Sequence, residues 1–375
     1  MKGHIAVNTR LLLPGRVEGI SRFAVEVLSR MVRRNPDIQF SFLFDRANDP
    51  AFVFGENVTP YVIPPQARHP LLWYAWFHGL ARFKLGQLKP NLLFSPEFYL
   101  TTHPDIPQVP VFHDLAYEHY PKDIAPFASW YCRRHSPRFA HLASHILTVS
   151  SFSKQDLVQQ YDLPEDKISV VYNGASDQFS PLPAEEQEKV RRKYSSGKPY
   201  VHFVGALHPR KNIDNLLKAF DQYKTETESP LQLLLVGRKG WQYQSALETY
   251  ENMQHRDAVL FTGFVSDEEL VRIYAASFAL CYVPYLEGFG IPLLEAMHAE
   301  TAIITGDRTS MPEVAGDAAL FADPYEPASI AHCLRQLYET PKRRTELIEA
   351  GKIQRDRFSW DQTYEKVWTV LSRWL

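Results

Sequence analysis

The chain has 375 residues, of which 45% are hydrophobic and 22% charged, and its formal net charge is −2 at pH 7. This length exceeds what one typical core holds, so two domains are expected, and the composition is that of an ordinary globular protein. A near-neutral chain without blocks of like charge is poorly suited to binding nucleic acid, so no nucleic-acid partner is expected.

Three further observations bear on localisation. Cys132, Cys281 and Cys333 lie far apart and match neither a disulfide framework nor a zinc pattern, which favours a reducing compartment. The N-terminus lacks the long apolar region of a signal peptide. No apolar run approaches the roughly 20 residues that span a bilayer. A cytoplasmic, soluble protein is therefore expected.

The N-terminal half alternates short apolar runs with helical patterns. Strands are predicted at 4–8, 39–44, 92–94, 109–113, 146–149 and 168–171, and helices at 20–34, at 129–143 and from about residue 154. The first helix has Phe23, Val27, Leu28 and Met31 on one face. Repeated strand–helix units favour a doubly wound parallel sheet.

Two loops of this half contain candidate ligand contacts. Gly15 and Gly19 lie between the first strand and the first helix and make a cradle of backbone N–H groups, although such a glycine pair alone is a weak signal. His113 and Asp114 follow an apolar run that ends at Phe112. In open α/β sheets, ligands bind beyond the carboxyl ends of strands. His113 is therefore either a ligand contact at the mouth of a cleft or a histidine that is simply satisfied at a strand end.

Residues 70–84 form the most aromatic segment, and Arg68, Arg82 and Lys84 flank it or lie within it. The favoured interpretation is a helix whose tryptophans are buried against the sheet. The other is a surface in the Trp73–Phe77 region for a membrane or a hydrophobic acceptor.

A linker is predicted at 174–198, which contains Pro181, Pro183 and Gly197. The strand–helix alternation then restarts, with strands predicted at 200–204, 231–236, 259–263, 277–283 and 302–305. The last helical segment, 358–375, carries three tryptophans and is expected to pack across the joint between the two domains.

Arg210 and Lys211 follow the strand 200–204 and precede a helix. Cations at a helix N-terminus oppose the helix dipole, and a bound anion such as a diphosphate would relieve that conflict. The alternative is that both side chains are solvated.

Residues 285–297 give the strongest signal in the chain. Gly288 and Gly290 make a loop after a buried strand, and Pro292 suits the first turn of the helix that follows. A helix N-terminus after a glycine loop is suited to an anion, and Glu287 and Glu295 border it. Carboxylates beside an anion site fit a ligand that has both phosphate and sugar hydroxyls. Further on, Glu313 in the segment 309–317 is either a third acidic group of the same cleft or a helix cap.

Together these segments resemble the retaining glycosyltransferases of family 4. The resemblance rests on Gly205–Asn212 with its Arg-Lys-Asn end, on the E-x7-E motif from Glu287 to Glu295, and on Thr309–Asp317. It runs over nearly the whole chain. It implies the GT-B fold, in which two Rossmann-like, doubly wound parallel-sheet domains face a central cleft. The implied parts are an acceptor-binding domain at 1–178, a nucleotide-sugar-binding domain at 179–357 and the terminal helix at 358–375.

The resemblance also implies roles by position. Arg210 and Lys211 would hold the donor diphosphate, Glu287 would lie against the sugar, Glu295 would accept from the ribose hydroxyls, and His113 would contact the transferred sugar. These roles make His113, Arg210, Lys211 and Glu287 the catalytic candidates. The remaining donor-binding candidates are Gly15, Gly19, Gly205, Gly237, Phe264, Val265, Gly288, Phe289, Gly290 and Ile291. Two positions depart from the common family pattern: Ala206 stands where many relatives have Arg, and Ser21 where many have Gly.

The implied chemistry is transfer of a hexose, with mannose favoured, from a GDP-sugar or UDP-sugar to a glycan or lipid-linked oligosaccharide in cell-surface polysaccharide synthesis. No Asp-x-Asp motif for a diphosphate-bound metal is present, so no metal is expected. A non-catalytic sugar-nucleotide-binding protein of the same fold is the alternative. An NAD-dependent oxidoreductase is disfavoured because no G-x-G-x-x-G follows the first strand. The partners expected are therefore a nucleotide sugar and a glycan or glycolipid, with peripheral membrane contact left open.

Overall fold

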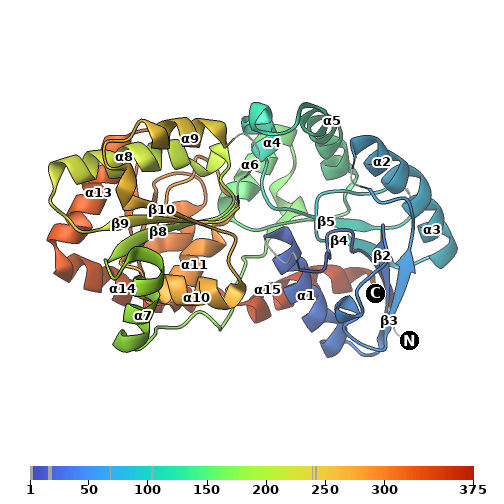
Figure 1. The fold of residues 1–375 in the computed structure, drawn as a ribbon. Coiled ribbons are helices and arrows are strands. Elements are labelled where there is room, and N and C mark those ends of the chain that lie inside the picture. The colour runs from blue at the N-terminus through green and yellow to red at the C-terminus, as the bar shows by residue number, and fades with distance from the viewer. Residues whose placement is uncertain (1–2, 16–18, 68, 103–104, 239, 241–242) are drawn as a thin grey trace. The chain divides into compact units, whose positions relative to one another are not determined.

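The structure is a computed structural model that describes all residues except 1–2, 16–18, 68, 103–104, 239 and 241–242. The chain forms two compact units (Figure 1). Unit 1 consists of Met1–Asn173 and Ser359–Leu375, and unit 2 of Gly174–Phe358.

Within the described residues, unit 1 contains a seven-stranded parallel sheet in the order β3-β2-β1-β4-β5-β6-β7. Its strands are β1 (Gly3–Asn8), β2 (Ile38–Phe44), β3 (Val58–Val62), β4 (Leu92–Ser95), β5 (Gln108–Phe112), β6 (Ile146–Thr148) and β7 (Ile168–Val170). Its helices are α1 (Ile20–Arg34), α2 (Pro70–Ala75), α3 (Ala81–Leu88), α4 (Ala116–His119), α5 (Pro126–Leu142), α6 (Ser151–Tyr161) and α15 (Trp360–Leu371).

Within its described residues, unit 2 has a six-stranded parallel sheet in the order β10-β9-β8-β11-β12-β13. The strands are β8 (Tyr200–Val204), β9 (Gln232–Val236), β10 (Val259–Gly263), β11 (Ala279–Tyr282), β12 (Ala302–Gly306) and β13 (Ala319–Ala322). The helices are α7 (Ala184–Ser195), α8 (Ile213–Glu226), α9 (Gln244–Glu251), α10 (Asp267–Ala276), α11 (Ile291–His298), α12 (Met311–Ala315), α13 (Pro327–Glu339) and α14 (Pro341–Arg355).

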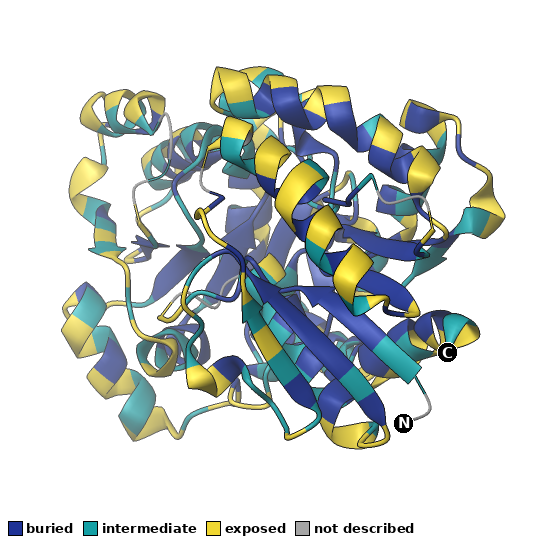
Figure 2. Cartoon of the chain, turned by 90° about the vertical axis from the view of Figure 1, so that its right-hand side faces the viewer, coloured by how far each residue is buried: buried dark blue, intermediate teal, exposed yellow. Residues whose placement is uncertain are grey.

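Both sheets confirm the predicted doubly wound architecture. Central strands such as β5 and β9 are buried along their whole length, and Figure 2 shows buried strands beneath helices whose outer faces are exposed. Helices cover parallel sheets on both faces, so their strands read as continuous apolar runs. The edge strands β3 and β13 were not predicted. β3 contains Pro60 and alternates in burial, as an edge strand does, and β13 is only four residues long.

The terminal helix α15 belongs to unit 1 and packs on α1. Phe23 and Trp360 meet edge to face at 6.3 Å, and Arg30 Nε donates to Asp361 at 2.8 Å. Thr363 Oγ1 donates to the carbonyl of Tyr172 at 2.5 Å. These contacts fasten the end of the chain to its beginning.

Among the described residues, no helix combines the length and the apolar character needed to cross a membrane.

Candidate active site

The centre of the unit 2 sheet is where its strand order reverses. β8 and β11 lie side by side there, and the chain continues from β8 toward one edge and from β11 toward the other. Loops at the carboxyl ends of two such strands diverge and leave a crevice, which is the usual ligand site of open α/β sheets. The loop after β8 carries Arg210 and Lys211, and the loop after β11 carries Glu287.

These three side chains form one ion cluster. Arg210 Nη1 donates to Glu287 Oε1 at 2.7 Å, and Lys211 Nζ is paired with the same oxygen. The side chains of Arg210, Lys211 and Glu287 are 26%, 14% and 13% exposed, so none is simply solvated. Burial by itself would raise the pKa of the Glu287 carboxyl, but Lys211 and Arg210 hold that pKa below its usual value. The cluster keeps two cations and one anion, which leaves it with one net positive charge.

This geometry corrects one step of the sequence argument. Arg210 and Lys211 do precede a helix, α8, but the anion that offsets them within the protein is Glu287. An external anion is therefore not needed to explain both cations. An external anion would instead be attracted by the one net positive charge of these three side chains.

Tyr282 is a fourth member of the cluster that sequence reasoning missed. Its hydroxyl accepts a hydrogen bond from Lys211 Nζ at 2.5 Å. Burial, and after it the charge of Glu287, raise the pKa of this hydroxyl well above its usual value. Tyr282 is the last residue of β11 and reads in the sequence as part of a buried strand, so no sequence signal marks it.

Backbone and side-chain contacts hold the two loops in register. The N–H of Tyr285 donates to the carbonyl of Arg210 at 3.0 Å. Asn212, which has the left-handed φ of 63°, donates through Nδ2 to the carbonyls of Val283 at 2.9 Å and Pro324 at 2.6 Å. Asparagine tolerates this backbone region, which explains why the Arg-Lys-Asn run ends with it.

The segment 309–317 supports the same loop from another side. Ser310 Oγ donates to the carbonyls of Glu287 at 2.9 Å and Phe289 at 3.1 Å. Glu313 lies in the first turn of α12, where a carboxylate is favourable to the helix dipole. Ser310 was not among the predicted site residues.

Glu295 lies in the helix that follows this loop, and Gly290 caps that helix. Glu295 lies about one turn into α11 and accepts a hydrogen bond from the Tyr274 hydroxyl at 2.7 Å. Gly290 caps α11 with a φ of 95°, and a Cβ there would lie 2.5 Å from Met311 Cε. Ile291 is the first helical residue and is half-buried. Glu287 therefore lies in the loop before α11, and Glu295 lies in the helix itself.

Gly205 and Gly237 meet each other directly. The N–H of Gly205 donates to the carbonyl of Val236 at 2.9 Å, and a Cβ on Gly237 would lie 2.0 Å from the carbonyl oxygen of Gly205. The glycine at 237 is thus required by the close approach of the loops after β8 and β9. Phe264 and Val265 follow β10, at the edge of the sheet. Phe264 is 66% exposed, and Val265 packs on the core.

The candidate residues of unit 1 lie at the carboxyl ends of its strands. His113 Nε2 lies 2.9 Å from the carbonyl oxygen of Pro96, and the ring meets Phe23 edge to face at 5.1 Å. Burial lowers the pKa of His113. A carbonyl only accepts, so the neutral ring carries its proton on Nε2, and Nδ1 is left as an acceptor. Asp114 Oδ1 accepts from the N–H of Ala116 at 3.0 Å, a contact within the loop after β5.

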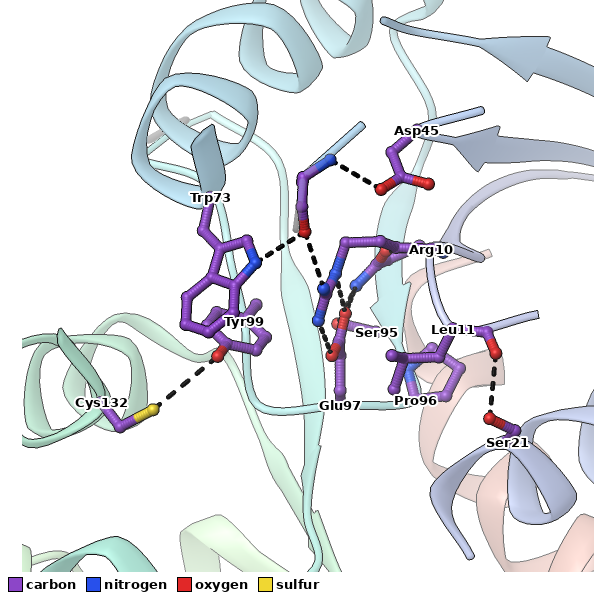
Figure 3. Close-up of polar contacts among 12 residues, drawn as sticks. Arg10, Leu11, Ser21, Asp45, Trp73, Ser95, Pro96, Glu97, Tyr99 and Cys132 are labelled. Atoms are coloured by element: carbon purple, nitrogen blue, oxygen red, sulfur yellow. Dashed lines mark hydrogen bonds and ion pairs between the residues drawn. The ribbon is translucent and has the colours of Figure 1, made fainter. Parts of the chain in front are cut away.

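The first loop of unit 1 is partly described. Gly15 and Gly19 have φ values of 67° and 51°, and the loop residues 16–18 between them lie outside the described residues. Ser21 Oγ donates to the carbonyl of Leu11 at 2.9 Å (Figure 3). At the position where many relatives have glycine, the Ser21 side chain therefore binds the backbone of the preceding loop.

A buried polar network fills the central position of the unit 1 sheet, beyond β1 and β4. Arg10 Nη2 and Nε donate to the two oxygens of Glu97 at 2.6 and 3.0 Å, and Asn8 Nδ2 donates to Glu97 Oε1 at 2.8 Å (Figure 3). The Arg10 and Glu97 side chains are only 9% and 5% exposed. Burial alone would lower the pKa of Arg10, but Glu97 raises it above its usual value. Sequence reasoning did not single out this network.

Two family models match this chain. The family model for glycosyl transferases group 1 matches residues 185–354, and the model for glycosyltransferase family 4 matches residues 17–179. The O-antigen chain mannosyltransferase B of Escherichia coli is 32% identical over 303 residues, which cover 78% of each chain. The chain belongs to the family 4 glycosyltransferases. This confirms the family that the sequence motifs predicted.

Other relatives and solved structures agree with this assignment. The O-antigen chain mannosyltransferase RfbU of Salmonella typhimurium is 28% identical to this family 4 chain over 78% of it and 77% of the relative. Anabaena Alr3699/HepE, in complex with UDP and glucose, superposes with a TM-score of 0.76 at 16% identity over 99% of each chain. WaaG, a glycosyltransferase involved in lipopolysaccharide biosynthesis, gives a TM-score of 0.75 at 16% identity over 98% and 99%. At these identities the solved structures show the fold alone, and it is the predicted GT-B fold.

Proposed function

We propose that this glycosyltransferase transfers mannose from a nucleotide-diphosphate sugar to a glycan acceptor in cell-surface polysaccharide synthesis, with retention of the anomeric configuration. The names of the matched O-antigen mannosyltransferases support the sugar and the process. GDP-mannose is favoured over UDP-sugars as the donor, and the acceptor is a glycan or a lipid-linked oligosaccharide.

The observation that carries the proposal is the ion cluster in unit 2. Arg210 and Lys211 share one carboxylate oxygen of Glu287, so these three side chains together carry one net positive charge. A diphosphate is the part of the donor that such a charge would bind. Glu295, about one turn into α11, would accept hydrogen bonds from ribose hydroxyls, and Gly288 to Ile291 would present backbone to the donor.

The proposed reaction follows from these charges. The bond between the sugar C1 and the diphosphate oxygen breaks, and Arg210 and Lys211 stabilise the negative charge that develops on the leaving group. Fixed charges aimed at developing charge are usually the largest catalytic term. The acceptor oxygen bonds to C1 on the face that the diphosphate leaves, and the acceptor proton passes to a leaving phosphate oxygen. Glu287 would lie against the sugar.

His113 would contact the transferred sugar through only one of its two ring nitrogens. Because its Nε2 proton is directed at the Pro96 carbonyl, the ring would contact the sugar through Nδ1, which accepts a hydrogen bond from a sugar hydroxyl. The positive charges of the cluster replace a metal ion in the proposal. We place the activity in the cytoplasm at the inner face of a membrane, where a lipid-linked acceptor would be met.

A thermal-shift screen with GDP, UDP, ADP and their sugar conjugates tests the donor. A ligand that binds only the folded chain raises the melting temperature, so GDP and GDP-mannose are expected to give the largest shifts. A larger shift with another base would replace GDP as the donor class. No shift with any nucleotide would contradict the proposal.

Incubation with the stabilising sugar nucleotide and a glycan acceptor then separates the enzyme from its alternative. Release of free nucleoside diphosphate with an elongated, retained-configuration product supports transfer. Binding without any product favours a sugar-nucleotide-binding protein of the same fold.

A further inference from the structure

Two helical segments of unit 1 contain no acidic residue. They are residues 69–88, which cover α2 and α3, and residues 125–142, which cover α5. The chain has 43 acidic residues among 375, so 38 residues would ordinarily hold about four. The same two segments carry five basic side chains, Arg82, Lys84, Arg133, Arg134 and Arg138.

The outer face of α2 and α3 exposes large apolar side chains. Trp76 and Phe77, in the π-helical turn that joins α2 to α3, are buried at 1% exposure, and Trp73 is half-buried. The sequence interpretation that the tryptophans are buried therefore holds fully for Trp76 and in part for Trp73. Leu71, Tyr74 and Phe83, however, are 64%, 52% and 69% exposed. The segment therefore has one face in the core and another that is apolar and open to solvent.

Helix α5 presents a matching stripe. Phe127 and Trp130 are 41% and 56% exposed and lie in its first turns, and the exposed Arg134 and Arg138 follow at helical spacing. Arg133 pairs with Glu118 at 3.2 Å, whereas Arg134 and Arg138 make no ion pair within the described residues. Aromatic side chains thus begin the stripe and guanidinium groups continue it.

Ring contacts join the two segments into one surface. His69 stacks on Phe127 and Phe127 stacks on Trp130, each with ring centroids 5.4 Å apart. The ring centroids of Tyr74 and His135 of α5 are 5.8 Å apart. Figure 1 shows α5, α2 and α3 following one another along one side of the unit. We name Leu71, Tyr74, Phe83, Phe127 and Trp130, with the five basic residues, the aromatic-basic surface.

A hollow opens beside Phe83. It has a volume of about 450 Å³ and is lined by Gly79, Arg82, Phe83, Gly86 and Gln87. The two glycines leave this space open, and Arg82 and Phe83 set a cation and an aromatic ring side by side. Such a hollow suits a group that is charged at one end and apolar at the other.

We propose that the aromatic-basic surface docks onto a membrane rich in anionic phospholipid. Exposed aromatic and aliphatic side chains enter the headgroup region, and nearby arginines are attracted to a negatively charged lipid surface. Charge complementarity favours this occupant over a neutral glycan. Stacked aromatics would also fit a glycan, but a neutral glycan gives no reason for the lack of acidic residues in both helical segments. This proposal rests on the part of the proposed function that places the protein at the inner face of a membrane. It does not depend on glycosyl transfer.

Vesicle flotation of the full chain tests the proposal. Vesicles of phosphatidylcholine with about one third phosphatidylglycerol are compared with vesicles of phosphatidylcholine alone. We expect at least about tenfold more protein on the anionic vesicles, and loss of that excess at 1 M salt, where the Debye length is about 3 Å. Equal binding to both vesicles, or no binding, would overturn the proposal.

Matched variants locate the contact. Arg134→Glu with Arg138→Glu should abolish the preference for anionic lipid, and Phe83→Ser with Trp130→Ser should reduce binding about tenfold. The controls are Lys342→Glu and Ile353→Ser on α14 of unit 2, whose side chain at 342 and residue at 353 are 88% and 76% exposed. Controls that lose binding as far as the variants do would overturn the assignment.

Two further measurements keep the outcomes distinct. Binding of a soluble glycan without any vesicle binding would assign the stacked rings to carbohydrate and overturn the membrane proposal. Nucleotide thermal shifts on the same variants, without vesicles, report on unit 2. If the wild-type chain floats with anionic vesicles but shows no nucleotide shift, the result counts against the proposed reaction and not against membrane docking.

Discussion

Unit 1 and unit 2 each place an arginine beyond one central strand and a glutamate beyond its neighbour. In unit 1 the pair is Arg10, after β1, with Glu97, after β4, and in unit 2 it is Arg210, after β8, with Glu287, after β11. The positions are topologically equivalent. The charge balance differs, because Arg10 faces its own carboxylate through two hydrogen bonds, whereas Glu287 serves both Arg210 and Lys211.

The difference separates two uses of one position in the fold. The Arg10–Glu97 pair is almost fully buried and balanced, so it has no charge left for a ligand. The unit 2 cluster is more exposed and has one cation in excess. The proposed diphosphate site therefore rests on the charge balance at the centre of the sheet and not on the presence of an ion pair there.

The largest effect is expected from breaking the balanced pair. Glu97→Ala leaves the buried Arg10 guanidinium without its carboxylate, and removing one partner of a buried pair costs about 3–5 kcal/mol of unfolding free energy. Urea unfolding measures this loss. The control is Glu226→Ala, which breaks the exposed Arg335–Glu226 pair and should cost under about 1 kcal/mol. Equal losses in both variants would remove the distinction.

In unit 2, removing one member of the ion cluster should lower the turnover rate. Lys211→Ala removes half of the positive charge that faces the diphosphate, and we expect turnover to fall about 10²-fold or more. Initial rates at saturating donor measure it. Lys193→Ala, which breaks a surface contact with Glu269, should leave the rate unchanged. Near-wild-type turnover in Lys211→Ala would exclude the assigned role.

A smaller effect is expected one helical turn away. Glu295→Ala should weaken nucleotide binding about tenfold or more, because hydrogen bonds to a charged group contribute about 1.5–3 kcal/mol and about 1.4 kcal/mol is a factor of ten. Titration calorimetry with the preferred nucleotide measures the change. Tyr274→Phe removes the hydroxyl that holds Glu295 but keeps the carboxylate, so its effect should be smaller. Unchanged affinity in Glu295→Ala would take the ribose role away from that residue.

The cluster should also leave a modest trace in the pH dependence of stability. The pKa of Glu287 in the folded protein lies below its ordinary value of 4.5, so the unfolded chain binds more protons in the interval between the two. Stability therefore rises with pH across that interval. The contribution is fully present above about pH 4.5 and is lost as pH falls through the folded pKa. Acid unfolding of Glu287→Gln should be less steep there, and an unchanged slope would contradict the coupling.

The smallest effect is expected from metal removal. If Arg210 and Lys211 supply the charge that a metal would otherwise supply, EDTA should leave the transfer rate unchanged. A rate that collapses with EDTA and returns with Mg²⁺ would replace the metal-free proposal.

Much of the fold could be predicted because buried parallel strands are continuous apolar runs. The run at 200–204 matches β8 residue for residue, and the run at 302–305 falls one residue short of the buried strand β12. Of the four edge strands, β7 and β10 were predicted and β3 and β13 were missed, because β3 contains a proline and β13 is only four residues long. The residue range of α2 and α3 was anticipated in part, but the π-helical turn between them has no sequence signal.

The candidate site was predictable only as far as local motifs extend. Arg210, Lys211 and Glu287 were found because each follows a strand in a recognisable loop. Their pairing depends on β8 lying beside β11, which is a long-range property of strand order. Tyr282, Ser310 and the Arg10–Glu97 pair were missed for the same reason, since their partners are distant in the sequence and their residue types are common.

The position of α15 has a consequence for biosynthesis. Unit 2 is one continuous stretch of chain, whereas unit 1 needs α15, which is translated after all of unit 2. The face of α1 that carries Phe23 and Arg30 therefore waits through translation of the whole second unit before Trp360 and Asp361 emerge. Domains made first usually fold first on the ribosome. In this chain the order is reversed for the last step, because unit 1, most of which precedes unit 2 in the sequence, is completed only after unit 2 has been made.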